Sequence, residues 1–189
     1  YIFLDTDERR RFAQVSHEYL IEQVQHSSVN TAQIVAHDTR NTDSARMELR
    51  FNHPVKELVW RHTVGTGCCP ATGAVGKNTL CSALLQLNGH DRFRKRSGDH
   101  FARTQRYEHH TGCALGTTAA CVNAGVVNCY SFALKPEEHQ PSGTCNFSRI
   151  DNAVLEMNLI GEKATGGANV DAGKIDVYAV NYNVLRIMS

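Results

Sequence analysis

Hydrophobic and polar residues alternate with a period of two in several short stretches of the chain, a pattern typical of β-strands. In one of them, Leu155, Met157 and Leu159 share one face and polar residues occupy the other. The stretches with this period are Tyr19–Val24, Met47–Phe51, Val55–Trp60, Val154–Ile160 and Ile175–Met188. Short strands separated by turn residues predict an all-β fold, an antiparallel sandwich or jelly roll.

The last of these strands carries an alternating set of large side chains. Tyr178, Val180, Tyr182 and Val184 fall on one face of Ile175–Met188. Because aromatic and β-branched side chains combine on that face, we expect it to lie in the core.

The run Tyr130–Asp151 predicts a β-hairpin. Tyr130–Leu134 alternates as a strand does, and Cys145–Ile150 is a second extended segment. Between them, Pro136–Gly143 has two prolines and a Ser-Gly exit, which favours a loop. Nothing in this run is typical of a reaction centre.

Two further turns are expected from local signals. Asn88-Gly89 follows a leucine-rich strand and is a strong hairpin-turn signal. Asn52-His53-Pro54 interrupts the alternation between two strands, so it predicts a kink or a tight turn.

One short helix is expected near the N-terminus, over Thr6–Ala13. Asp5 with Glu8 three residues later resembles a capping box. The three consecutive arginines Arg9–Arg11 are expected to form a solvated face near a carboxylate.

Arg61–Ser82 and Asp91–Asn128 fit no strand well. Long irregular segments in a sandwich emerge at its ends, where surface variation accumulates. We therefore expect both segments to be loops at one end of the fold.

Composition is that of an ordinary globular chain. The 189 residues are 41% hydrophobic and 21% charged, with a formal net charge of +1. This length suits one large domain, and the near-neutral charge gives no global reason to bind nucleic acid. No apolar stretch is long enough to span a bilayer. The first residues carry charges where a signal peptide is apolar, and we expect the chain to be a fragment of a longer protein.

The seven cysteines form no C-x-x-C pair, so zinc-ribbon and thioredoxin-like sites lack their signature. Free thiols are the simplest reading, with one or more disulfides as the alternative. The cysteines are Cys68, Cys69, Cys81, Cys113, Cys121, Cys129 and Cys145. Cys145 has no sequence context that would lower a thiol pKa, and is expected to be a small buried residue.

Other candidate motifs fail on spacing. Gly73–Thr79 lacks the register of a phosphate-binding loop, and the chain has no G-x-S-x-G and no H-x-H pair. The adjacent His109 and His110 are expected to be hydrogen-bonded loop residues. A basic and aromatic run, Arg92–Tyr107, could bind single strands by stacking, but its acidic residues favour a solvated or subunit-contacting loop. No residue is therefore assigned a catalytic, cofactor-binding or metal-binding role, no cofactor is expected, and the chain is not expected to be an enzyme.

Five long stretches resemble, in the same order, the major capsid protein of the nucleocytoplasmic large DNA viruses (phycodnavirus, mimivirus and iridovirus-like). These stretches are Tyr1–Ala13 with His17–Gln25, Phe51–Trp60, Leu85–Phe93, Tyr130–Asp151 and Gly173–Ser189, and the loops Arg61–Ser82 and Asp91–Asn128 would then face outward or contact neighbouring subunits. By contrast, 61–82 and 112–128 do not resemble that family.

The resemblance implies a double jelly-roll protein. Residues 1–14 would be the end of a preceding jelly roll with a linker helix, and 15–189 the C-terminal jelly roll. Three such chains would form a homotrimeric, pseudo-hexagonal capsomer of an icosahedral shell. The implied partners are neighbouring capsomers and minor capsid proteins, with no specific nucleic acid and no direct membrane insertion. The implied location is the virion, after assembly in the host cytoplasm. The alternative is a carbohydrate-binding jelly-roll module.

Overall fold

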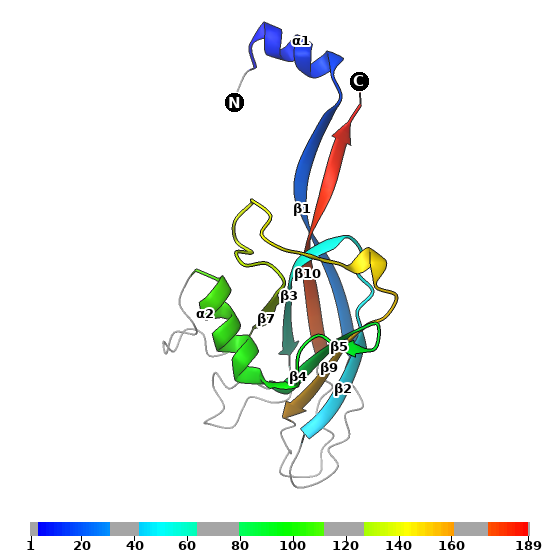
Figure 1. The fold of residues 1–189 in the computed structure, drawn as a ribbon, viewed down its shortest axis with the longest axis vertical. Coiled ribbons are helices and arrows are strands. Elements are labelled where there is room, and N and C mark those ends of the chain that lie inside the picture. The colour runs from blue at the N-terminus through cyan, green and yellow to red at the C-terminus, as the bar shows by residue number, and fades with distance from the viewer. Residues whose placement is uncertain (1–3, 31–41, 64–79, 112–126, 161–173, 189) are drawn as a thin grey trace.

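The computed structural model is an antiparallel β-sandwich with short helices (Figure 1). The structure describes residues 4–30, 42–63, 80–111, 127–160 and 174–188. Sheet A consists of β1 (His17–Asn30), β10 (Lys174–Ile187), β3 (Pro54–Thr63), β7 (Asn128–Ser131) and β8 (Cys145–Asn146). Sheet B consists of β2 (Thr42–Glu48), β9 (Ala153–Ile160), β4 (Leu80–Leu87), β5 (His90–Asp91) and β6 (Arg96–Ser97).

The strand order is that of a jelly roll. Sheet A runs β1-β10-β3-β7 and sheet B runs β2-β9-β4-β5, with every pairing antiparallel. Strands adjacent in sequence, such as β1 and β2 or β9 and β10, lie in opposite sheets, so the chain crosses the sandwich repeatedly. The predicted fold class is confirmed.

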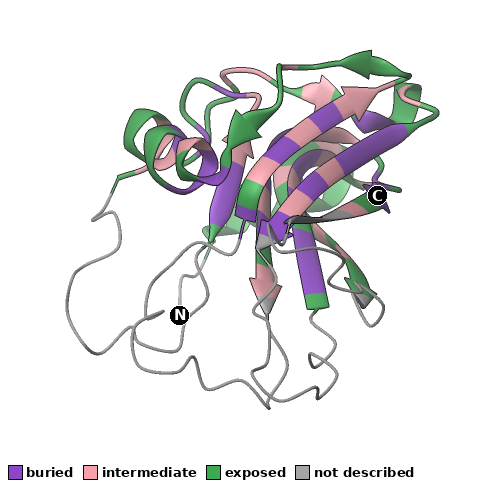
Figure 2. Cartoon of the chain, turned by 90° about the horizontal axis from the view of Figure 1, so that it is seen from below, coloured by how far each residue is buried: buried purple, intermediate pink, exposed green. Residues whose placement is uncertain are grey.

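The core lies between the two sheets, and buried residues alternate with less buried ones along their strands (Figure 2). Each fully buried aliphatic side chain contributes about 1.5–3 kcal/mol relative to exposure. The largest side chains that are almost fully buried include Met47, Leu58, Trp60, Leu85, Leu155, Met157, Ile175 and Val177.

The predicted core face of β10 is wrong for two of its residues. Ile175 and Val177 are fully buried, whereas Tyr178 is 36% and Val184 56% exposed on the opposite face. Tyr182 is buried, but beneath Lys56, whose Nζ lies 5.5 Å from the ring centroid. Both faces of β10 carry β-branched residues, so alternation separates the faces without showing which one a second sheet covers.

Strands β1 and β10 extend beyond the sandwich as a two-stranded ribbon. β3 pairs with β10 only as far as Asn181, whereas β1 continues to Ile187. We call the paired segments 17–22 and 182–187 the ribbon. In Figure 1 it projects from the body and carries α1 (Thr6–Gln14) at its tip.

The predicted hairpin in Tyr130–Asp151 is wrong. β7 and β8 do not pair with each other; both pair with the same edge of β3, one after the other. The run is thus one edge strand interrupted by residues 132–144, which we call the excursion. Its start is fixed because the amides of Phe132 and Ala133 both donate to the Lys56 carbonyl.

Gly143 allows the excursion to close. Its φ is +150°, and a Cβ atom there would lie 2.7 Å from the Phe132 carbonyl oxygen. Only glycine fits this close backbone approach. The proline-framed loop was therefore correctly located, but it returns the chain to the same strand line instead of reversing it.

The two predicted turns are confirmed. Asn88 and Gly89 both have positive φ, as a type I′ turn between β4 and β5 requires. The Asn88 side-chain oxygen also accepts from the amides of Asp151 and Asn152. At the kink, His53 has a φ of 66°, and the chain passes from sheet B into β3 of sheet A.

The helix near the N-terminus is confirmed, with Asp5 accepting a hydrogen bond from the Thr6 amide. A second helical segment was not predicted: the π-helix η1 (His100–Thr104) leads directly into α2 (Gln105–His109). Phe101 is fully buried and packs on Trp60, which anchors this segment beside β7. A 3-10 helix, η3 (Phe147–Arg149), follows β8. Among the described residues, no helix is long and apolar enough to cross a membrane.

Candidate assembly surface

Large hydrophobic side chains are exposed on the outer face of sheet A. Along β1, Leu20 is 39% and Val24 65% exposed, and both lie on the same face as Tyr178 and Val184 of β10. The register pairs Leu20 with Val184, and Val24 with Val180. We call Leu20, Val24, Tyr178 and Val184 the outer strip. The Glu22–Tyr182 pair, with Lys56 bound to Glu22, lies between Leu20–Val184 and Val24–Val180, so the strip consists of two apolar patches. Exposed apolar patches are typical of interaction sites.

Polar groups border the outer strip and fix its geometry. His26 stacks on Tyr178 with ring centroids 4.6 Å apart, and its Nε2 lies 2.9 Å from Asp176 Oδ1. Lys174 Nζ is 2.8 Å from the same oxygen. These contacts, led by the hydrogen bond with Lys174, hold the pKa of Asp176 below its ordinary value. The strip is thus an apolar surface with an ordered polar border.

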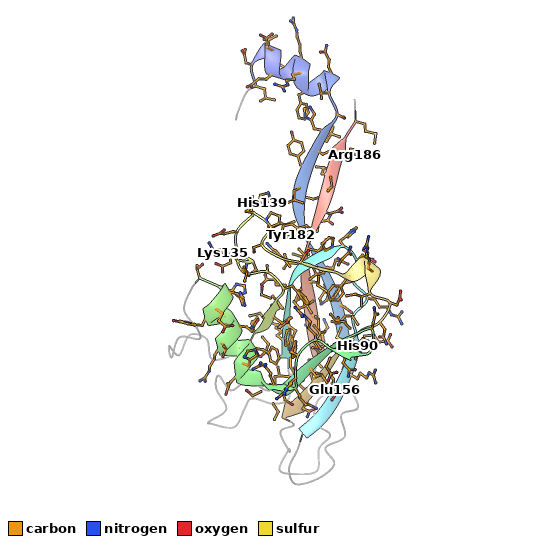
Figure 3. All side chains as sticks on the ribbon, viewed as in Figure 1. His90, Lys135, His139, Glu156, Tyr182 and Arg186 are labelled. Atoms are coloured by element: carbon orange, nitrogen blue, oxygen red, sulfur yellow. The ribbon has the colours of Figure 1, made fainter. Side chains whose placement is uncertain are left out.

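The ribbon adds an aromatic surface on its other face. Phe12, His17 and Tyr19 stack in succession, with centroid distances of 4.6 and 6.2 Å. Leu185 pairs with Tyr19 in register and is 46% exposed. In β1 this face continues the core-facing side of sheet A, past the point where β3 stops pairing. Arg186 lies on the ribbon, well away from His90 and Glu156 on the body (Figure 3).

The ends of the sandwich differ. In sheet A, Asn30 pairs with Lys174 and Lys174 with Thr63; in sheet B, Thr42 pairs with Ile160. The strand ends that flank 31–41, 64–79 and 161–173 are therefore grouped at the end opposite the ribbon (Figure 1). Most of the predicted loop 61–82 and the 112–126 part of the other loop lie outside the described residues. Where the second segment is described, the expected loop at one end is wrong, because 91–109 contains the end of β5, β6, η1 and α2, and α2 packs beside β7.

The predicted basic and aromatic run does not form a stacking platform. Phe93 and Phe101 pack with each other at 5.4 Å between centroids and belong to the core or its border. Tyr107 alone of its three aromatics is openly exposed, at 88%. Lys95 pairs with Glu156 and Arg103 with Asp99, so part of the positive charge is locally balanced.

The described cysteines, Cys81, Cys129 and Cys145, are free thiols. Cys129 is buried, and burial raises the pKa of its thiol to about 12. Burial also raises the pKa of Cys145, which is half-buried against the core. Neither thiol has the lowered pKa of a nucleophile. The other four cysteines and Gly73–Thr79 lie outside the described residues.

The two adjacent histidines are hydrogen-bonded, as expected. His109 Nδ1 lies 3.0 Å from the Leu134 carbonyl oxygen, and His110 Nδ1 lies 3.2 Å from Glu137 Oε1. They occupy the end of α2 and the residue after it. In the part of the chain that the structure describes, no three His, Cys, Asp or Glu residues are grouped so that they could hold a metal ion.

Sequence reasoning missed the outer strip because it placed this face in the core. Lys174 and Asp176 share the face of Tyr178 and were the available polar signal. The exposed aromatic face of the ribbon could not be predicted from the sequence, because nothing in Phe12 to Ile21 indicates where the opposing sheet ends.

Comparisons with known proteins agree with this architecture. The family described as large eukaryotic DNA virus major capsid protein matches residues 8–189. The major capsid protein of Pyramimonas orientalis virus is 48% identical over 100% of the chain, which covers 45% of that protein. The major capsid protein of Paramecium bursaria Chlorella virus 1 is 40% identical over 100% of the chain and 51% of that protein. The chain spans about half the length of the curated relatives it matches.

Solved structures give the same result. A quasi-atomic model of the PBCV-1 virus capsid contains a chain with a TM-score of 0.75 and 39% identity, covering 100% of this chain and 54% of that one. The Faustovirus major capsid protein shares the fold, with a TM-score of 0.61 at 13% identity. The resemblance noted in the sequence is thereby confirmed, and these relatives give no support to a carbohydrate-binding module.

Proposed function

Because the chain belongs to the family of large eukaryotic DNA virus major capsid proteins, we propose that it is a structural part of a virion shell. Its proposed role is assembly rather than catalysis. The observation that carries this proposal is the outer strip, whose four large apolar residues are exposed on β1 and β10, two of them in the body of sheet A and two in the ribbon. A folded sheet face of this kind is stabilised when a neighbour covers it.

We propose that residues 15–189 form the C-terminal jelly roll and that residues 1–14 end a preceding one. Support comes from the relatives' greater length and from α1, which leads into β1 at the tip of the ribbon. In this arrangement three copies form a homotrimeric, pseudo-hexagonal capsomer in which jelly rolls lie flank to flank. The outer strip is covered by the adjacent jelly roll of the capsomer.

The further partners are neighbouring capsomers and minor capsid proteins, and the site of assembly is the host cytoplasm. A closed shell multiplies modest contacts between subunits into a stable whole. The strand ends opposite the ribbon are the candidates for the outward surface, as the sequence pattern suggested.

Light scattering and electron microscopy of the full-length protein that contains this chain test the proposal. A trimeric mass with hexagonal outlines is expected. A monodisperse monomer that binds glycans would contradict it and would favour the carbohydrate-binding alternative.

A further inference from the structure

A cluster of titratable side chains joins three elements on the side of the sandwich formed by β3, β7 and α2. His110 follows α2 and lies between two carboxylates. Its Nε2 is 3.0 Å from Glu57 Oε2 of β3, and its Nδ1 is 3.2 Å from Glu137 Oε1 of the excursion. Glu57 and His110 are mostly buried, with side chains 11% and 21% exposed.

Further contacts tie the excursion to this cluster. Glu137 Oε2 accepts from the amide of Thr111 at 2.9 Å and from its hydroxyl. His109 Nδ1 lies 3.0 Å from the Leu134 carbonyl oxygen. These bonds, led by the Thr111 hydroxyl, lower the pKa of Glu137, while burial raises the pKa of Glu57.

His110 Nε2 and Glu57 Oε2 are 3.0 Å apart but are buried without hydrogen-bond geometry, so this contact is favourable as a charge pair. A neutral imidazole carries a proton on only one nitrogen, so its other nitrogen would face a carboxylate with lone pair against lone pair. The arrangement is favourable when His110 is doubly protonated, or when one carboxyl holds the proton. In either form the three groups together carry one negative charge instead of two.

We propose that Glu57, His110 and Glu137 form a proton-operated latch, which holds the excursion and the end of α2 on sheet A while the shared proton is bound. Loss of that proton leaves two carboxylates beside a neutral ring, with Glu57 mostly buried and Glu137 40% exposed. The latched segments carry Tyr107 and Leu134, which are 88% and 73% exposed, so opening of the latch alters an exposed apolar surface.

The charged groups around the cluster do not replace the shared proton of Glu57, His110 and Glu137. Lys56 faces Glu57 but lies 2.8 Å from Glu22 of β1, which offsets much of its positive charge. The remaining groups that face or flank the cluster are Arg106, Glu108 and His109 of α2, Cys129 of β7, and Lys135, Glu138 and His139 of the excursion. Lys135 and His139 are labelled on the excursion in Figure 3.

The sign of the pH dependence follows from proton binding. The closed latch keeps the shared proton to a higher pH than the open one, so closure is fully favoured at low pH and is lost as rising pH removes that proton. The limit for one proton is about a tenfold change in the closing equilibrium per pH unit. At the acid end, closure weakens again as pH falls through the lowered pKa of Glu137.

Hydrogen–deuterium exchange of the full-length protein tests the latch between about pH 5.5 and 8.5. The reporter is the Thr111 amide, corrected for the intrinsic exchange rate. Its protection is expected to fall with rising pH, by up to about tenfold per unit.

Two matched variants complete the test. Glu137→Gln keeps an acceptor for Thr111 and removes a charge, so the change in protection should drop to less than about twofold over the same range. Glu138→Gln, one residue away and paired with Lys135, should follow the unmodified protein. Thermal unfolding of both variants verifies that they are folded. Protection that is flat with pH in the unmodified protein, or an equal pH response in Glu137→Gln, would overturn the latch.

Discussion

Strands β1 and β10 run through both the body of the sandwich and the ribbon, but what covers their side chains differs between the two regions. In the body, Ile175 and Val177 of β10 are fully buried by sheet B. In the ribbon, Tyr19 and Leu185 continue the core-facing side of β1 and its partner but are each 46% exposed. Alternation creates an apolar face in both regions, and only the body has a second layer to cover it. The ribbon and the outer strip therefore leave large apolar side chains exposed in this chain.

The largest expected difference between the two regions comes from one truncation in each. Ile175→Ala should lower the free energy of unfolding by about 2–5 kcal/mol, because it removes a fully buried side chain and leaves a cavity. Leu185→Ala, in the same strand but half-exposed, should cost less than about 1 kcal/mol in the unassembled protein. Urea unfolding monitored by Trp60 fluorescence measures both, and equal losses would contradict the contrast.

A second comparison uses two glycines with positive φ. Gly143→Ala should destabilise the protein by about 2–4 kcal/mol, because the new Cβ would meet the Phe132 carbonyl at 2.7 Å. Gly89→Ala also carries a positive φ but has nothing within 4 Å of its Cβ position, so about 1 kcal/mol is expected. Thermal unfolding separates them. A Gly143→Ala variant as stable as Gly89→Ala would mean that the excursion does not close against β7.

A third comparison uses two ion pairs, one buried where the body meets the ribbon and one exposed on the ribbon. Lys56 of β3 is 3% exposed and pairs with Glu22, so Lys56→Met should cost about 1–3 kcal/mol by leaving carboxylates poorly compensated. Arg186 pairs with Glu18 on the ribbon, where both side chains are more than half exposed, so Arg186→Met should cost less than about 1 kcal/mol. Chemical denaturation at low and high salt measures both. A larger loss of stability for Arg186→Met than for Lys56→Met would contradict the contrast between buried and exposed ion pairs.

Much of the fold could be predicted from sequence, because strand alternation and turn residues are local properties. Asn88-Gly89, the Asn52–Pro54 kink and the Asp5-capped helix follow from residue chemistry alone. The excursion could not, since two short strands joined by a loop look alike whether they pair with each other or with a shared third strand. The α2 segment has too few residues for a helical period to stand out among its charges.

The surface was harder to predict than the fold. Whether Tyr178 is buried depends on which face of β10 meets sheet B, and that is a tertiary property. The latch depends on residues 57, 110 and 137, which are far apart in sequence and are brought together by the edge of β3. The adjacent His109 and His110 stood out in the sequence, but the sequence did not indicate the two carboxylates that contact His110.

We propose above that the outer strip is covered when the subunits assemble, and one pair of variants tests this coverage most directly. In the full-length protein, the double variant Val24→Lys with Val184→Lys places charges on the strip. The control double variant, Arg46→Ala with Arg50→Ala, changes two exposed residues, one in β2 of the opposite sheet and one in the segment that follows β2. Light scattering is expected to find a trimer for the unmodified protein and for the arginine variant, and a folded monomer for the strip variant. A strip variant that assembles as the unmodified protein does would contradict the account.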